Sequence, residues 1–198
     1  MPADIDLCND ALATIGEAPI TALDQGTIPA NNCQRFYASL RQAVLREGQW
    51  RFAKARTSLA QDAVAPNYYW VYSFTLPSDC LKVLPNDPTD RTSWAVEGRH
   101  LMMNSLPSVY YPQISPLPQT AYILYIKDVT DLNEWDAMAY QVFSARLASK
   151  LAAAIQRDMK RSQELLGLAN ALMLSALSTD GQEASPVPIG PDDLIRDR

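Results

Sequence analysis

The chain has 198 residues, enough for one domain or two small ones, and its 47% hydrophobic and 20% charged residues are ordinary for a globular protein. No apolar run approaches the roughly 20 residues that a membrane-spanning helix needs. The first ten residues lack the basic segment and apolar core of a signal peptide. We therefore expect neither a membrane span nor a secretory leader.

The net charge of −5 is unevenly distributed. Residues 1–34 carry five acids and no Lys or Arg, and residues 179–198 carry five acids and two Arg, which leaves the middle at +3. Basic side chains concentrate between Arg35 and Arg56. Such a split is typical of an oriented protein whose ends meet different charged partners, and solvated helix faces produce the same pattern.

Two helices are predicted before residue 50. The first spans residues 4–15 and is ended by Gly16, and the second has Asn31 or Asn32 as its N-cap and ends at Gly48. Apolar residues recur at spacings of three and four in both. They are Ile5, Cys8, Leu12 and Ile15 in the first helix, and Phe36, Leu40 and Val44 in the second.

The pattern changes between residues 51 and 127, which hold eight of the 14 prolines and alternate with a period of two. Strands are predicted at 52–59, 70–76, 81–84, 93–97, 99–103 and 121–127. Gly98 indicates a hairpin between the fourth and fifth of these. Prolines at 107, 112, 116 and 118 predict a long irregular loop, which in a compact domain usually serves function or an interface.

The longest helical pattern runs from Asp131 to Leu177. Asp131 and Glu134 have the spacing of a capping box, which predicts a helix start at Asp131. One helix over this stretch would be roughly 70 Å long, so we expect two helices with a break near Arg157 and Asp158. The helical pattern ends at residues 178–181.

These elements predict an α+β fold. Residues 1–50 and 128–178 are expected to form a discontinuous helical bundle, and residues 51–127 an inserted small antiparallel β domain. Residues 179–198 contain three prolines and few large apolar side chains, which predicts an extended C-terminal tail.

Motifs for chemistry are absent from the sequence. It contains no phosphate-binding glycine loop, no His/Cys metal spacing and no nucleophile motif around its single histidine, His100. The three cysteines, Cys8, Cys33 and Cys80, are expected to be buried small hydrophobes. We therefore predict no cofactor, no metal site and no catalytic residues, which is weak evidence for a structural role.

Several short stretches, in order and spacing, resemble the tail tubular protein A family, the head-to-tail adaptors of short-tailed bacteriophages. They cover roughly residues 5–178. They are residues 7–20 (LCNDALATIGEAPI), Arg46-Glu47-Gly48-Gln49-Trp50-Arg51-Phe52, the strand turn Leu76-Pro77-Ser78-Asp79, and the sheet-to-helix passage from Leu124 to Ala148. The chain departs from the family pattern at Gln49, which separates Gly48 from Trp50.

This resemblance implies a structural virion protein that forms a ring, typically of twelve copies, between the portal protein and the tail nozzle protein. The protein would be assembled in the host cytoplasm, with genomic DNA passing through the ring without specific binding. An acidic channel wall would repel phosphate and let DNA slide. Candidate channel-lining residues are Asp4, Asp6, Asp10, Asp131, Glu134 and Asp136.

The C-terminal tail ends with two aliphatic residues between charges. Such a segment could order on a partner, and by analogy with adaptor C-termini it would dock on the portal or a neighbouring subunit. A frayed terminus is an equal alternative. The candidate docking residues are Asp192, Asp193, Leu194, Ile195 and Arg196.

Two functions from other classes stay open. One is a small cytosolic hydrolase that uses carboxylates near the proline-rich loop, and it predicts a pocket that gathers perturbed carboxylates around His100. The other is a DNA-binding module that uses the basic residues from Arg35 to Arg56, and it predicts salt-dependent affinity for DNA.

Overall fold

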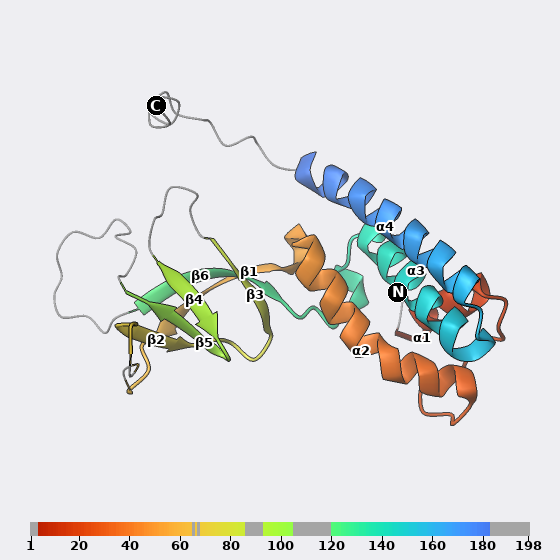
Figure 1. The fold of residues 1–198 in the computed structure, drawn as a ribbon, viewed down its shortest axis with the longest axis horizontal. Helices are drawn as coiled ribbons and strands as arrows, with labels where there is room; N and C mark the ends of the chain where they lie inside the picture. The colour runs from red at the N-terminus through yellow and green to blue at the C-terminus, as the bar shows by residue number, and fades with distance from the viewer. Residues whose placement is uncertain (1–3, 65, 67, 86–92, 105–119, 183–198) are drawn as a thin grey trace.

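The computed structural model describes residues 4–64, 66, 68–85, 93–104 and 120–182. Within these residues, four α-helices form one end of an elongated molecule and two three-stranded antiparallel sheets form the other (Figure 1). The sheets are inserted between the second and third helices, which confirms the predicted α+β class. None of the described helices is both long and apolar enough to span a membrane.

The predicted start agrees with the structure for the first helix and differs from it for the second. Helix α1 (Asp4–Thr14) starts as predicted, and Gly16 follows it with φ +78°. Helix α2 (Ile28–Gly48) begins earlier than predicted, because Thr27 is its N-cap and accepts from the Ala30 amide. A proline in the first helical turn needs no amide partner, so it favours this earlier start. The predicted caps, Asn31 and Asn32, therefore lie inside the helix.

Helix α3 (Ala137–Leu151) begins six residues later than predicted. Asp136 is its N-cap and accepts from the amides of Met138 at 2.8 Å and Ala139 at 3.4 Å. Asp131 instead caps a short 3₁₀ turn, Leu132–Glu134. The expected capping box is therefore wrong.

The predicted break in the C-terminal helical stretch is confirmed. A π-helical turn, Ala152–Gln156, follows α3, and Arg157 then takes a left-handed conformation with φ 56°. Helix α4 (Met159–Gln182) folds back along α3 (Figure 1).

Helix α4 runs past its predicted end at residues 178–181. Asp180 explains the extension, because it accepts from the Arg51 backbone amide at 3.2 Å and its carbonyl accepts from Arg51 Nε at 2.7 Å. The predicted extended tail therefore does not begin at residue 179. Residues 183–198, with the five candidate docking residues, and the proline-rich loop at 105–119 lie outside the described residues.

Two sheets replace the single predicted one. The first has the order β1 (Lys54–Ala60), β6 (Thr120–Lys127), β3 (Cys80–Leu84), and the second has the order β2 (Tyr72–Thr75), β5 (His100–Met103), β4 (Trp94–Glu97). Gly98, with φ +61°, joins β4 to β5 as the predicted hairpin.

Strand β6 is covered on both faces. Ala121, Ile123 and Tyr125 belong to a small core between the two sheets. Ile126, from the other face, is fully buried in the helical core, and Leu124 packs against that core. The helical core therefore extends onto one sheet, and the double coverage explains why the apolar alternation of β6 is weak.

Trp50 fills the joint between α2 and β1. Its side chain is fully buried and its Nε1 donates to the Val44 carbonyl at 3.0 Å. The ring lies against Gly48, where an added Cβ would be 2.2 Å from Trp50 Cε2. Only glycine fits at this position beside Trp50.

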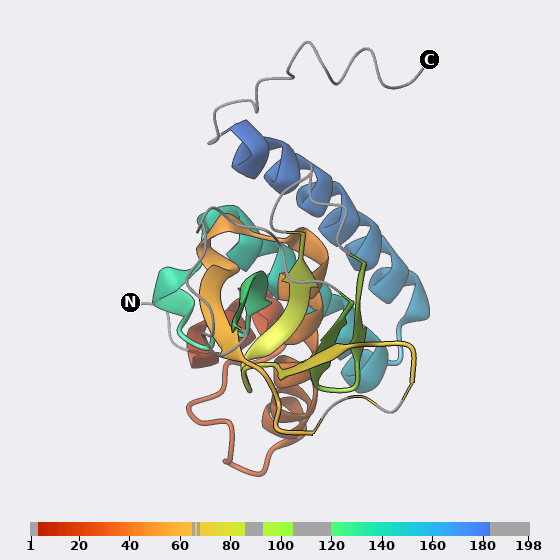
Figure 2. The same cartoon turned by 90° about the vertical axis from the view of Figure 1, so that its left-hand side faces the viewer.

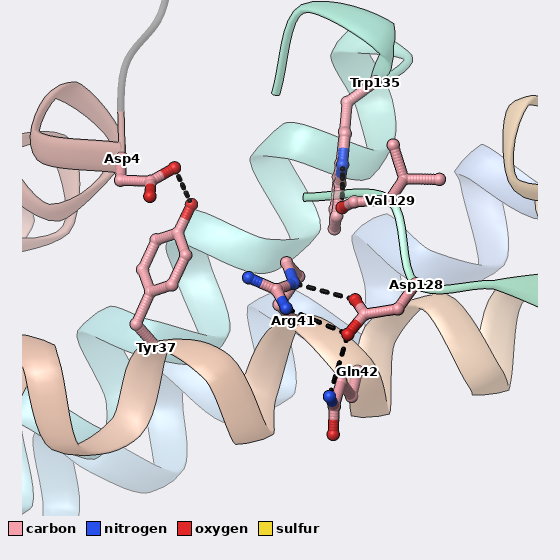
Figure 3. Close-up of polar contacts among 7 residues, drawn as sticks. All are labelled: Asp4, Tyr37, Arg41, Gln42, Asp128, Val129 and Trp135. Atoms are coloured by element: carbon pink, nitrogen blue, oxygen red, sulfur yellow. Dashed lines mark hydrogen bonds and ion pairs between the residues drawn. The ribbon is translucent and has the colours of Figure 1, made fainter. Parts of the chain in front are cut away.

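A polar joint connects α2 to the segment that follows β6 (Figure 3). Arg41 Nε and Nη2 each donate to one Asp128 carboxylate oxygen at 2.9 Å, and Gln42 Nε2 donates to Oδ2 at 2.8 Å. Trp135 Nε1 donates to the Val129 carbonyl at 3.2 Å, which fixes the turn that leads into α3.

Substituting Gly48→Ala tests this packing. The new methyl group would overlap the buried indole, so we expect the free energy of unfolding to fall by about 1–3 kcal/mol. Gly167→Ala is the matched control, because no heavy atom lies within 4 Å of its added Cβ. That control should gain up to about 1 kcal/mol from helix propensity. Urea unfolding measures both, and a wild-type midpoint for Gly48→Ala would contradict the packing argument.

Candidate functional site

A pocket of about 940 Å³ lies beside the second sheet. It is lined by the segment between β1 and β2, including Asp62, Tyr68 and Trp70, and by His100 of β5. Asp62 reaches the pocket because β1 ends with a bridge between Gln61 and Phe74 of β2. The pairing of Thr75 with His100 then brings the histidine alongside.

Asp62 gathers the polar groups of this pocket. Its Oδ2 accepts from Ser73 Oγ at 2.5 Å and lies 3.0 Å from His100 Nδ1. Its Oδ1 accepts from the backbone amide and the hydroxyl of Thr75, at 3.0 and 2.7 Å. These contacts fasten the end of β1 to β2 and β5.

The surroundings of Asp62 favour its anionic form. Burial raises the pKa of Asp62, but the hydrogen bonds from Ser73, Thr75 and His100 outweigh it and hold the pKa below its usual value of 3.8. A carboxylate held in this way is a poor general acid or base near neutral pH, because such catalysis needs a pKa near the operating pH.

The same side chains do not have the arrangement of a nucleophilic triad. In such a triad, the carboxylate and the hydroxyl meet opposite ring nitrogens of the histidine. Here Asp62 Oδ2 and Ser73 Oγ both lie on the Nδ1 side of His100, at 3.0 and 3.5 Å. The pocket around His100 therefore contains one carboxylate with a shifted pKa, and its polar cluster has a geometry that joins neighbouring strands.

Aromatic side chains form the outer wall of the pocket. Tyr69 adopts φ 66° and meets Trp70 edge-to-face with ring centroids 4.8 Å apart. Trp70 Nε1 donates to Glu97 Oε1 at 2.9 Å. Tyr68 is 86% exposed beside them, with Val64 and Val71 also exposed. We call Val64, Tyr68, Tyr69 and Val71 the aromatic tip.

A second exposed apolar surface lies on α4. Between Leu165 and Leu177 this helix contains no charged residue, although only one side of it is buried. Leu166, Leu168 and Leu174 are 45%, 51% and 72% exposed. In Figure 2, α4 lies along the outside of the molecule. We call the exposed residues of this stretch the α4 outer face.

The predicted channel-lining acids do not form one cluster of contacts. Asp4 accepts from the Tyr37 hydroxyl and Asp10 from the Tyr140 hydroxyl, both at 2.7 Å (Figure 3 for Asp4). The carboxyl groups of Asp131 and Asp136 cap helical turns, and Glu134 pairs with Lys127 at 3.3 Å. Asp6 is exposed on α1. These acids thus have contacts within the chain rather than with one another, and whether any faces a channel stays a prediction.

The basic stretch from Arg35 to Arg56 does not act as one patch. Arg41 pairs with Asp128 and Arg51 with Asp180, and both arginines join α2 and the following turn to distant segments. Arg35 and Arg56 are exposed, one on α2 and the other on β1. This dispersal gives the DNA-binding alternative little support.

The cysteines are buried and form no disulfide, as predicted for small hydrophobes. Among the described residues, no group of three or more His, Cys, Asp or Glu side chains is placed to hold a metal ion.

Comparison with known proteins adds no assignment. The chain matches no protein-family model and no curated protein.

Asp62→Asn tests the polar cluster. A lowered pKa in the folded state contributes stability above the unfolded value of 3.8, and this contribution is lost as the pH falls through the folded pKa. We expect the variant to melt at a lower temperature than the wild type at neutral pH, and the difference to shrink in acid. Asp24→Asn, in an exposed loop, is the control for loss of a surface carboxylate and should melt at the wild-type temperature at neutral pH. A constant difference at all pH values would rule out this linkage.

Proposed function

We propose that this chain is a structural subunit of a bacteriophage head-to-tail adaptor. In this proposal, copies form a ring, typically of twelve, between the portal protein and the tail nozzle protein. Genomic DNA passes through the ring without specific binding, and the subunit catalyses no reaction.

The α4 outer face carries the proposal. A helix that exposes leucines on several sides and lacks charge for thirteen residues is typical of one that becomes covered by another chain. Only one side of α4 packs on α3 within the subunit. A neighbouring copy in a ring would cover the rest.

The aromatic tip supplies a second, different surface. A ring is built from heterologous contacts, in which one patch of a subunit meets another patch of the next. The tip belongs to the sheet end of the molecule and α4 to the helical end, so they lie on separate parts of an elongated subunit (Figure 1). This separation suits a contact that repeats around a ring.

The residues that carry the family resemblance hold the fold together. Gly48 and Trp50 form the joint between α2 and β1, and the Asp79 carbonyl accepts from the Asp128 amide at 2.8 Å. The residues at these positions are therefore needed for the fold. The resemblance thus supports a shared fold more directly than a shared contact surface.

Electron microscopy of the protein mixed with its proposed partner, the portal ring, tests the proposal. We expect a second tier of density on the portal with a central hole wide enough for DNA. The protein alone is the control, and a free monomer there is compatible with assembly on the portal template. Absence of portal binding would refute the adaptor function.

Paired substitutions test the role of α4. Leu168→Glu with Leu174→Glu would place two carboxylates in the proposed contact, so we expect assembly on the portal to weaken by about tenfold or more. Both side chains are exposed, so the subunit should still fold. Gln34→Glu with Gln163→Glu adds the same charge at exposed positions outside the α4 outer face and should assemble normally. Wild-type assembly of the leucine variant would remove α4 from the interface.

A further inference from the structure

A smaller pocket of about 440 Å³ lies where α2 meets both sheets. Arg46 of α2, Lys82 of β3 and Arg99, in the turn between β4 and β5, line it. Trp94, Val96 and Leu76 supply apolar lining. Three basic side chains thus come from three separate segments of the chain, and among the described residues no Asp or Glu lines the pocket.

Backbone carbonyls hold two of these side chains in place. Arg46 Nη1 donates to the Leu81 carbonyl at 2.7 Å. Arg99 Nη1 donates to the Cys80 carbonyl at 3.2 Å, and its Nη2 donates to the Pro77 carbonyl. A register shift between Cys80 and Lys82 leaves Leu81 without a partner residue on β6. The bulge thereby frees the carbonyl that anchors Arg46.

The positive charge of the pocket is not neutralised by the described residues. None of the three basic groups forms an ion pair within the described part of the chain. Two described acids adjacent in sequence to pocket residues have other partners, since Glu47 pairs with Arg146 and the Asp79 carboxylate accepts from the Tyr125 hydroxyl. Carbonyl anchors orient a guanidinium without cancelling its charge, which leaves it available to an anion.

We propose that this pocket binds the phosphate monoester or diphosphate group of a small molecule. A phosphate monoester carries about two negative charges at neutral pH, which suits three converging cations better than a single carboxylate does. The volume falls within the usual range for small-molecule sites. Trp94, 37% exposed, gives an organic phosphate such as a nucleotide a surface for stacking.

Duplex DNA fits the pocket less well. Its phosphates carry one charge each and are displayed on a broad convex surface, whereas these cations line a recess shared with apolar side chains. The inference does not depend on the adaptor function, because it concerns the isolated subunit and can fail or succeed separately.

Calorimetric titration of the full chain at constant ionic strength tests the site. The probes are orthophosphate, pyrophosphate and adenosine monophosphate. We expect saturable binding of pyrophosphate that Lys82→Gln weakens about tenfold, because it removes one charged contact. Lys54→Gln, an exposed lysine on β1, is the control and should bind as the wild type does. If the base stacks on Trp94, Trp94→Ala should weaken the binding of adenosine monophosphate alone. If the pocket takes free phosphate, this substitution should leave the affinity for all three probes unchanged.

A second pair of variants keeps the test valid if Lys82→Gln does not fold. Val96→Glu introduces a carboxylate into the lining and should abolish binding, whereas Val71→Glu, at another exposed valine, should not. No binding of any probe, or equal weakening by Lys82→Gln and Lys54→Gln, would overturn the proposal. Binding of duplex DNA that pyrophosphate does not displace would also overturn it, in favour of a nucleic-acid surface.

Discussion

The carboxylate of Asp128 is the contact on which the arrangement of the two ends depends. It accepts from Arg41 and Gln42 of α2, while its backbone amide donates to the carbonyl of Asp79 before β3. Helix, sheet edge and the passage into α3 therefore meet at one residue. The side chains of Arg41 and Asp128 are only 12% and 15% exposed, so loss of either partner would leave the other as a largely buried charge without an ion-pair partner. The pair thus specifies one orientation of helices and sheets, whatever its net contribution to stability.

Strand β6 extends this orientation into the apolar interior. One of its faces packs in the helical core and the other in the core between the sheets. The second sheet therefore rests on the first, and the first rests on the helices. Because of this layering, both pockets include residues of the second sheet, and their shapes depend on contacts made one layer below.

Local sequence signals located most elements, and the errors have physical causes. The break after α3 follows from the length of the helical pattern and the polar residues around Arg157, since neither Gly nor Pro marks it. The N-cap of α2 is Thr27 rather than Asn31 or Asn32, because a proline in the first turn permits the earlier start. Helix α4 extends further than its local pattern indicates, because Asp180 contacts Arg51 across 129 positions of sequence. Both pockets were out of reach for the same reason. Asp62, Ser73 and His100, or Arg46, Lys82 and Arg99, become neighbours only through strand register, which no local pattern encodes.

The insertion of the sheets between α2 and α3 has a consequence for synthesis on the ribosome. Helices α1 and α2 bury their apolar faces against α3, which begins about 90 residues after α2 ends. Strand β1 likewise waits for β6, its partner from Lys54 to Ala60. At typical translation rates this interval is on the order of 10 s, during which the emerging chain exposes apolar surface without a partner. The nascent chain is therefore a natural client for ribosome-associated chaperones, and its folding is completed only after the residues of α3 have emerged.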